Sequence, residues 1–155
     1  MSRYAESTGV PSDRSRSEIE RTLRRYGATT FTYGWTEGRA AIGFVKDGRQ
    51  IRFVLPLPDR DDRAFTHTPA RGTPRTEAEI EKQYEQAVRQ RWRALALMVK
   101  AKLEAVDAGI VTFEAEFLPH TVLPSGRTVF EDIGPTIDLA YRSGQVAPLQ
   151  IEGLR

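Results

Sequence analysis

The side chains that could form a catalytic or metal site are close together in one short segment. His67 follows three aspartates, and carboxylate and imidazole groups at this spacing can bind divalent metals. The aspartates are Asp59, Asp61 and Asp62. Arg60 and Arg63 alternate with them, and such alternation is typical of charges that neutralise one another on a solvated loop. We therefore expect no metal site, and a hydrolytic site using His67 ranks below the binding hypotheses.

The rest of the sequence lacks the usual nucleophile and cofactor motifs. The chain contains no cysteine, which excludes disulfides, thiolate metal sites and thiol nucleophiles. It has no G-x-S-x-G or S-x-x-K pattern, no H-E-x-x-H, no phosphate-binding loop motif and no G-x-G-x-x-G after a strand. We expect that the protein is not an enzyme, that it has no catalytic residues and that it uses no cofactor.

A row of basic side chains along one helical face points instead to a binding surface. The segment 89–102 holds five bases and no acid. At about 100° per residue, the row falls within roughly 60° of a helix surface. Its charged members, called the basic row below, are Lys82, Arg89, Arg93 and Lys100, with Gln86 among them. Such a row is typical of a surface that follows a phosphate backbone, and the alternative is an ordinary solvated helix face.

Two further basic groups could enlarge or replace this surface. Arg21, Arg24 and Arg25 lie in an expected N-terminal helix, and they add to the basic row only if both helices pack in one layer. Arg49, Arg52 and the small, polar face of the expected sheet offer a second possible surface, which lacks the exposed aromatic pair that stacks bases in RNA-recognition motifs.

The basic row needs a long helix, and the segment from Thr76 to Val106 predicts one. Thr76 and Glu79 form a capping box, and Gly109 lies just past the expected end. Apolar residues recur at steps of three and four and form one stripe. The stripe is Ile80, Tyr84, Val88, Trp92, Leu95, Val99, Leu103 and Val106.

Three strands are predicted before this helix, joined by turns at Glu37-Gly38 and Asp47-Gly48. The turns fix the register, with Phe44 opposite Ile51 and Tyr33 opposite Ile42. One face is apolar and is expected to form the core, while the other is small, polar and open. The apolar face is Phe31, Tyr33, Trp35, Ile42, Phe44, Ile51, Phe53 and Leu55.

These elements predict an α+β fold, a two-layer α-β-β-β-α sandwich with a three-stranded antiparallel meander, one long helix and a small C-terminal helical appendage. A capping box at Ser15 and Glu18 opens the first helix, whose Ile19 and Leu23 face the sheet. We expect a core domain at residues 13–107, an appendage at 108–144, and flexible tails at 1–12 and 145–155.

The appendage contains a short helix around Phe113 and Phe117 and a second helix opened by a capping box at Thr128 and Glu131. The second helix carries Ile133, Ile137 and Tyr141 and ends at Gly144; it packs on its own domain or swaps onto a neighbour. The proline-rich segment Pro58–Arg75 is long for a connection inside a domain, and such loops are usually functional or mobile.

The net charge of +2 hides an asymmetry. Residues 107–155 carry seven acids and three bases, whereas the preceding residues carry 20 bases and 14 acids. A basic body suits nucleic acid or an acidic partner, and the alternative is ordinary solvated surface. The N-terminus lacks the apolar region of a signal peptide, so we expect a cytoplasmic protein that binds no membrane.

Two resemblances accompany these patterns. The helix–three strands–helix order over residues 15–107 is similar to that of the double-stranded-RNA-binding domain and, more loosely, the Rad52-like core. The former begins its second helix with a lysine cluster, however, and residues 76–81 are acidic here. Several segments are similar in sequence to segments of a group of small bacteriophage and prophage proteins. These segments are GRQIRFVLPLPDRDD, FTHTPARG, YEQAVRQRWRALALMVKAKLEAV and LPSGRTV.

The phage resemblance implies a context in which accessory proteins handle DNA or obstruct a host protein. We therefore hold two hypotheses. The first is a nucleic-acid-binding accessory protein, with DNA preferred to RNA, that acts in replication or recombination. The second is a protein-binding module, such as an inhibitor of a host factor or an assembly subunit, using the loop Pro58–Arg75 and the acidic end. The oligomeric state stays open.

Overall fold

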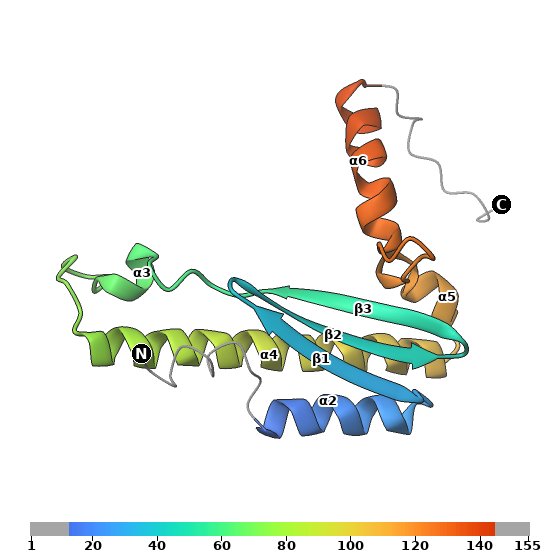
Figure 1. Ribbon diagram of the computed structural model, residues 1–155, viewed down its shortest axis with the longest axis horizontal. Coiled ribbons are helices and arrows are strands. Elements are labelled where there is room, and N and C mark those ends of the chain that lie inside the picture. The colour runs from blue at the N-terminus through green and yellow to red at the C-terminus, as the bar shows by residue number, and fades with distance from the viewer. Residues whose placement is uncertain (1–12, 145–155) are drawn as a thin grey trace.

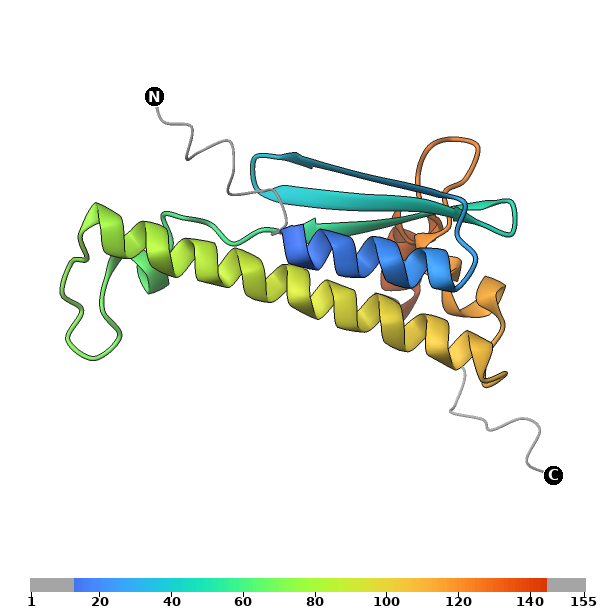
Figure 2. The ribbon, with the colours of Figure 1, turned by 90° about the horizontal axis from the view of Figure 1, so that it is seen from below.

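The computed structural model describes residues 13–144, which form a sheet layer and a helix layer (Figures 1 and 2). The elements are α2 (Asp13–Arg25), β1 (Thr30–Thr36), β2 (Arg39–Lys46), β3 (Arg49–Pro56), α3 (Arg63–Thr66), α4 (Glu77–Asp107), α5 (Phe113–Glu116), the 3-10 helix η1 (Leu118–His120) and α6 (Val129–Arg142). The predicted α+β class, with its meander, long helix and C-terminal helix, is confirmed.

The sheet has the strand order β1-β2-β3, and its register is the one that the two turns predict. Phe44 pairs with both Phe31 and Ile51, while Ile42 pairs with Tyr33 and Phe53. Asp47 and Gly48 both adopt positive φ angles, 51° and 74°, as a tight hairpin turn of the I′ type requires. Side chains in the middle of β2 and β3 alternate between buried and accessible, so Ala40, Ile42, Phe44, Ile51 and Phe53 face the helices.

The helix layer is built on α4, which crosses beneath the sheet with α2 beside it (Figure 2). The predicted capping box is present: Thr76 Oγ1 accepts from the Glu79 amide, and the Glu79 carboxylate accepts from the Thr76 amide. Trp92 and Val99 are 1% and 0% exposed, so the apolar stripe faces the core. The first helix starts at Asp13, which places Ser15 inside α2, so the prediction of a capping box at Ser15 was wrong. A sequence pattern determines the ends of a helix less well than it determines that a helix forms.

The prediction that Tyr33 and Trp35 belong to the core was also wrong. Their side chains are 37% and 40% exposed, although they share a strand face with half-buried Phe31. β1 is an edge strand that runs back along α2, so its later residues pass the first turns of that helix. Tyr33 there accepts a hydrogen bond of 2.7 Å from Arg16, whose guanidinium lies 5.2 Å from the ring centre.

Aromatic residues that follow α4 complete the core. Phe113 and Phe117 are 4% and 0% exposed. The Phe117 ring meets those of Phe44 and Phe53 edge-on, with centroids 5.9 and 6.1 Å away, an arrangement that aromatic quadrupoles favour. Phe113 of α5 and Phe117 just after it are therefore packed into the core, and η1 contacts β3.

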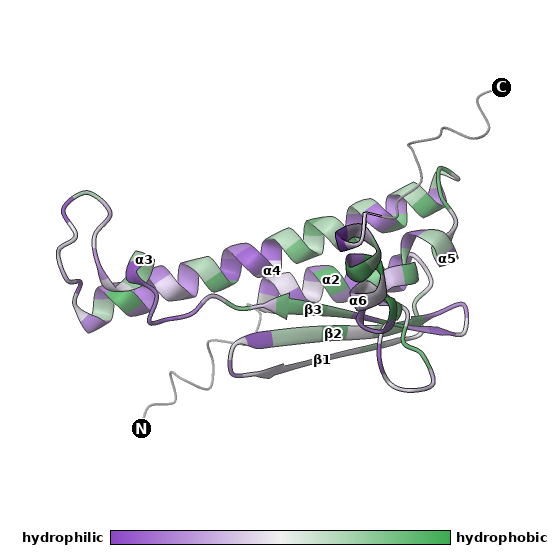
Figure 3. Cartoon of the chain, turned by 90° about the horizontal axis from the view of Figure 1, so that it is seen from above, coloured by the Kyte–Doolittle hydropathy of each residue, from purple (hydrophilic) through white to green (hydrophobic). Residues whose placement is uncertain are grey.

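α6 stands apart from both layers. It projects from the β3 side of the sheet (Figure 1), and none of its residues is buried. The predicted capping box is present, because Thr128 Oγ1 accepts from the Glu131 amide and the Glu131 carboxylate accepts from the Thr128 amide. Figure 3 shows green, hydrophobic residues on this projecting helix. The tails predicted at 1–12 and 145–155 lie outside the described residues.

Truncating Phe117 to alanine tests the aromatic part of the core. We expect a loss of about 3–5 kcal/mol in the free energy of unfolding, because this fully buried ring leaves a cavity between the rings of Phe44, Phe53 and Phe113. Urea denaturation measures it. Leu97→Ala is the matched control: Leu97 is 60% exposed on α4, and its truncation should cost no more than about 0.5 kcal/mol. Equal midpoints for the two variants would contradict this packing.

Candidate nucleic-acid interface

The orientation of α4 decides where its charged residues point. All four members of the basic row, Lys82, Arg89, Arg93 and Lys100, are exposed. Arg91 and Lys102 lie roughly 180° around the helix from the row and make structural contacts instead. Arg91 donates to the carbonyl of Pro56 at 2.7 Å, and Lys102 donates to Glu116 at 2.8 Å. The bases of α4 are thus divided between a solvent-facing row and a flank that holds β3 and α5.

The row is only loosely neutralised. Arg89 lies 4.0 Å from Glu85, and Lys100 lies 4.0 Å from Glu104; the two basic side chains are 55% and 50% exposed. For Lys82 and Arg93 no ion pair is found within residues 13–144. Exposed pairs one helical turn apart contribute only about 0.3–0.5 kcal/mol, so a phosphate could replace these carboxylates at little cost.

The arginines of α2 lie in the same layer as the basic row, which meets the condition for one joint surface (Figure 2). Arg21, Arg24 and Arg25 are exposed because Ile19 and Leu23 take the opposite face of α2 into the core. Arg24 pairs with Glu20 at 2.9 Å, one turn earlier on the same helix. Arg25 lines a surface hollow together with Asp107, so the anionic end of α4 weakens the site there.

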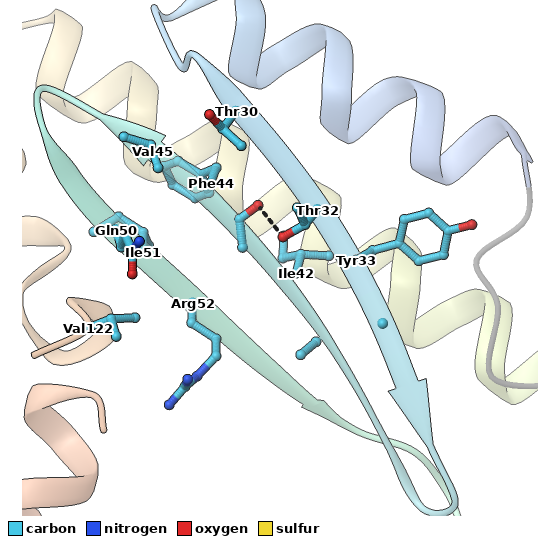
Figure 4. Close-up of a pocket in the computed structure, with 13 residues that line it drawn as sticks. Thr30, Thr32, Tyr33, Ile42, Phe44, Val45, Gln50, Ile51, Arg52 and Val122 are labelled. Carbon is cyan, nitrogen blue, oxygen red and sulfur yellow. Dashed lines mark hydrogen bonds between the residues drawn. The ribbon is translucent and has the colours of Figure 1, made fainter. Parts of the chain in front are cut away.

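The open face of the sheet is a second surface, occupied by a shallow hollow of about 430 Å³ (Figure 4). Small residues make it flat, and a side chain on Gly43 would come within 3.1 Å of Thr32 Oγ1. Arg52 borders the hollow, but it donates to the Gly126 carbonyl at 2.9 Å and to Glu131 at 3.2 Å. Its charge is therefore committed to the base of α6.

The charged residues 59–63 of the loop Pro58–Arg75 have partners within the fold. Asp62 accepts from the Ala64 amide at the start of α3, and Asp59 accepts from the Asp61 amide. Arg60 pairs with Glu81 and, at 3.4 Å, with Glu77. These contacts were not predicted from the sequence. The pattern that could have indicated them is the pair Glu77 and Glu81, two acids one helical turn apart at the start of α4.

The histidines do not form a catalytic group with these acids. His67 Nδ1 lies 2.8 Å from the neighbouring Thr66 hydroxyl, and His120 packs its ring 4.1 Å from that of Phe53. Across the described residues, no cluster of three or more histidine and carboxylate side chains is suited to hold a metal. Arg60 joins this loop to the first turns of α4 through Glu77 and Glu81.

No family model matches the chain, and the searches found no similar curated protein or solved structure. Among the described helices, none combines the length and apolar character needed to cross a membrane.

Burial beside Phe53, and then the positive charge of Lys102, lowers the pKa of His120 below its ordinary value, while Glu116 acts in the opposite direction. Protonation of His120 therefore favours the unfolded chain. Its contribution to stability is complete above the unfolded pKa of about 6.5 and is lost as the pH falls through that value towards the folded pKa.

We expect the free energy of unfolding to drop between about pH 7.5 and about pH 5.5, and the drop to be smaller in a His120→Phe variant, which keeps a ring on Phe53. Urea titrations at both pH values measure the difference, and the His120 NMR resonances report its pKa directly. A pH dependence that is identical in both proteins would contradict the assignment.

Proposed function

We propose that this protein binds nucleic acid through the basic row of α4, supported by the arginines of α2, and that it serves as a phage-type accessory factor in replication or recombination. The observation that carries the proposal is the division of the α4 bases. Four point to solvent along one line, while the other two are used in contacts with β3 and α5.

The geometry of the row suits a phosphate backbone. From Lys82 to Lys100 the helix rises roughly 27 Å, at about 1.5 Å per residue. The row therefore offers charges over several phosphates, and each neutralised phosphate releases counterions. The surface contains no groove-reading motif, which favours binding that depends on charge and little on sequence.

DNA is the preferred partner within this proposal. Recognition of double-stranded RNA in the topologically similar domain depends on lysines at the start of the second helix. Here the first turns of α4 carry Glu77, Glu79 and Glu81, and two of these acids pair with Arg60. That end of the helix would repel a phosphate backbone, so contacts are confined to the segment from Lys82 onward.

A second candidate function, an assembly subunit, is favoured by a different observation. α6 exposes large hydrophobic side chains and buries none of its residues. Soluble proteins rarely leave such a patch without a partner, and it makes protein contact a reasonable second role. The two roles use different surfaces and are compatible.

Replacing Arg89 and Arg93 by alanine tests the proposed interface. We expect affinity for DNA to fall on the order of tenfold or more at low salt, to a similar extent for all sequences. The magnitude of the slope of log affinity against log salt should fall by about 2 on duplex DNA, because two phosphate contacts are removed. Fluorescence anisotropy with labelled oligonucleotides at several salt concentrations measures both quantities.

Arg49→Ala with Arg71→Ala is the matched control. It also removes two positive charges from exposed positions outside the helices. Arg49 is at the start of β3, and Arg71 is in the loop Pro58–Arg75. We expect its affinity and salt slope to remain close to those of the unmodified protein. Loss of binding in the control alone would move the interface to the start of β3 or to the loop, and an absence of binding by the unmodified protein at low salt would end the proposal.

A further inference from the structure

We propose that the outer edge of β1 is a docking site for an extended, uncharged segment of another protein, which adds to the sheet as a fourth strand. The observation behind the proposal is a difference between the two edges of the sheet. The edge of β3 is occupied by other parts of the chain, whereas the edge of β1 is open and has none of the features that prevent strand pairing. Strand addition of this kind is a recurring mode of peptide recognition.

The register shows which backbone groups of β1 point outward. The Leu57 amide donates to the Gly38 carbonyl at 3.0 Å, and hydrogen-bonded pairs alternate along antiparallel strands. β2 therefore bonds to β3 through its even-numbered residues and to β1 through its odd-numbered ones. The partners of the odd-numbered residues on β1 are Thr30, Thr32, Gly34 and Thr36. The N–H and C=O groups of Phe31, Tyr33 and Trp35 consequently face away from the sheet, and they have no hydrogen-bond partner within residues 13–144.

The outer edge of β3, by contrast, is occupied at both ends. The Val122 amide donates to the Gln50 carbonyl at 2.9 Å near the start of the strand. At its end Arg91 donates to the carbonyl of Pro56, a residue that has no N–H to offer a further strand. The edge that is open to a new strand is therefore that of β1.

The sequence of β1 favours pairing. Edge strands usually prevent unwanted pairing with charged residues, proline or a bulge. Thr30–Thr36 contains no charged residue and no proline, and its pairing with β2 continues through all seven residues without a bulge. Apart from Gly34, every residue is β-branched or aromatic, the types that strands prefer. An added strand would meet an uninterrupted ladder of three outward donors and three outward acceptors.

Side chains beside the edge indicate which residues the added strand would carry. Tyr33 and Trp35 are exposed, and Figure 4 shows the Tyr33 ring extending past the edge of β1. They would be cross-strand neighbours of side chains on the same face of the added strand, and aromatic residues pair well with apolar ones. A hollow of about 180 Å³ lies between α2 and the start of β1, and its lining includes Leu23 and Phe31. Apolar residues at alternate positions of the partner therefore fit this edge.

The charges of α2 near the edge already have partners, which favours an uncharged segment. Glu20 and Arg24 line the hollow and pair with each other at 2.9 Å, and Arg16 donates to the Tyr33 hydroxyl. A charged side chain there would lose water and gain little in return. α2 also lies beneath this edge (Figure 2), so a second copy that paired its own β1 here would bring its α2 into the same space. A single extended segment meets no such obstacle.

Amide exchange of the labelled full chain, measured by NMR with and without a synthetic peptide, tests the proposal. The peptide has seven residues of alternating threonine and valine, and its threonine amides are methylated so that it presents one pairing edge. Without it, the amides of Phe31, Tyr33 and Trp35 should exchange rapidly, while those of Thr32 and Gly34, bonded to β2, are protected. At millimolar peptide we expect exchange of the three outward amides to slow in proportion to the bound fraction.

Trp35→Pro removes one outward donor and should bind the peptide roughly three- to tenfold more weakly than Trp35→Val, its matched control. Both variants lose the indole ring, but the valine variant retains the amide. The sheet should form in both, because the Trp35 amide is not bonded to β2 and proline is tolerated at such positions of an edge strand. A peptide methylated on every amide tests the same bonds without any change in the protein, and it should not bind.

Slower exchange of the three amides, with weaker binding by Trp35→Pro and by the fully methylated peptide, supports the proposal. An absence of binding, a response confined to other parts of the chain, or equal binding of the two peptides overturns it. Protection of the three amides without peptide also overturns it. If that protection rises with protein concentration, a second copy occupies the edge; if it does not, the chain covers the edge itself.

Discussion

The packing of α4 against the three-stranded sheet is the constraint on which the rest of the structure depends. Trp92 and Val99 are almost completely buried, and with them the rotation of a 31-residue helix is fixed. The direction of every other side chain of the helix then follows from the helical period. Arg91 and Lys102 reach β3 and α5, while Arg89 and Arg93 face water on the far flank. The candidate interface is thus a consequence of the core.

α4 is longer than the sheet, and this excess length explains the proline-rich loop. Its first turns extend past the strands, where α3 and the loop cover them (Figure 1). The Phe65 ring meets that of Tyr84 edge-on at 5.7 Å, and Arg60 pairs with two acids of the helix. A segment with the features of a mobile binding loop therefore stabilises the free end of the helix. Lys82, the first member of the basic row, directly follows the acids that pair with Arg60.

The sequence predicted what depends on local periodicity. Two tight turns fixed the strand register, and the stripe from Ile80 to Val106 fixed which side of α4 is buried. It could not predict what depends on how far one element extends along another. Tyr33 and Trp35 have the alternation of core residues, but they pass the start of α2 and are exposed. Ile133 and Ile137 have the spacing of a core helix, and no core lies beside them. The basic row was readable because exposure follows from the same stripe, whereas the loop contacts of Arg60 join residues too far apart for any period to connect.

The central claim is that nucleic acid binds the basic row of α4. The most direct test is to find which backbone amides of the protein respond to a bound oligonucleotide. Amide NMR spectra of the labelled protein should change on addition of a short DNA strand at low salt. The account predicts that the largest changes fall between Lys82 and Lys100 and on the outer face of α2. Changes confined to the open sheet face around Thr32 and Gly43, or no changes at all, would contradict it.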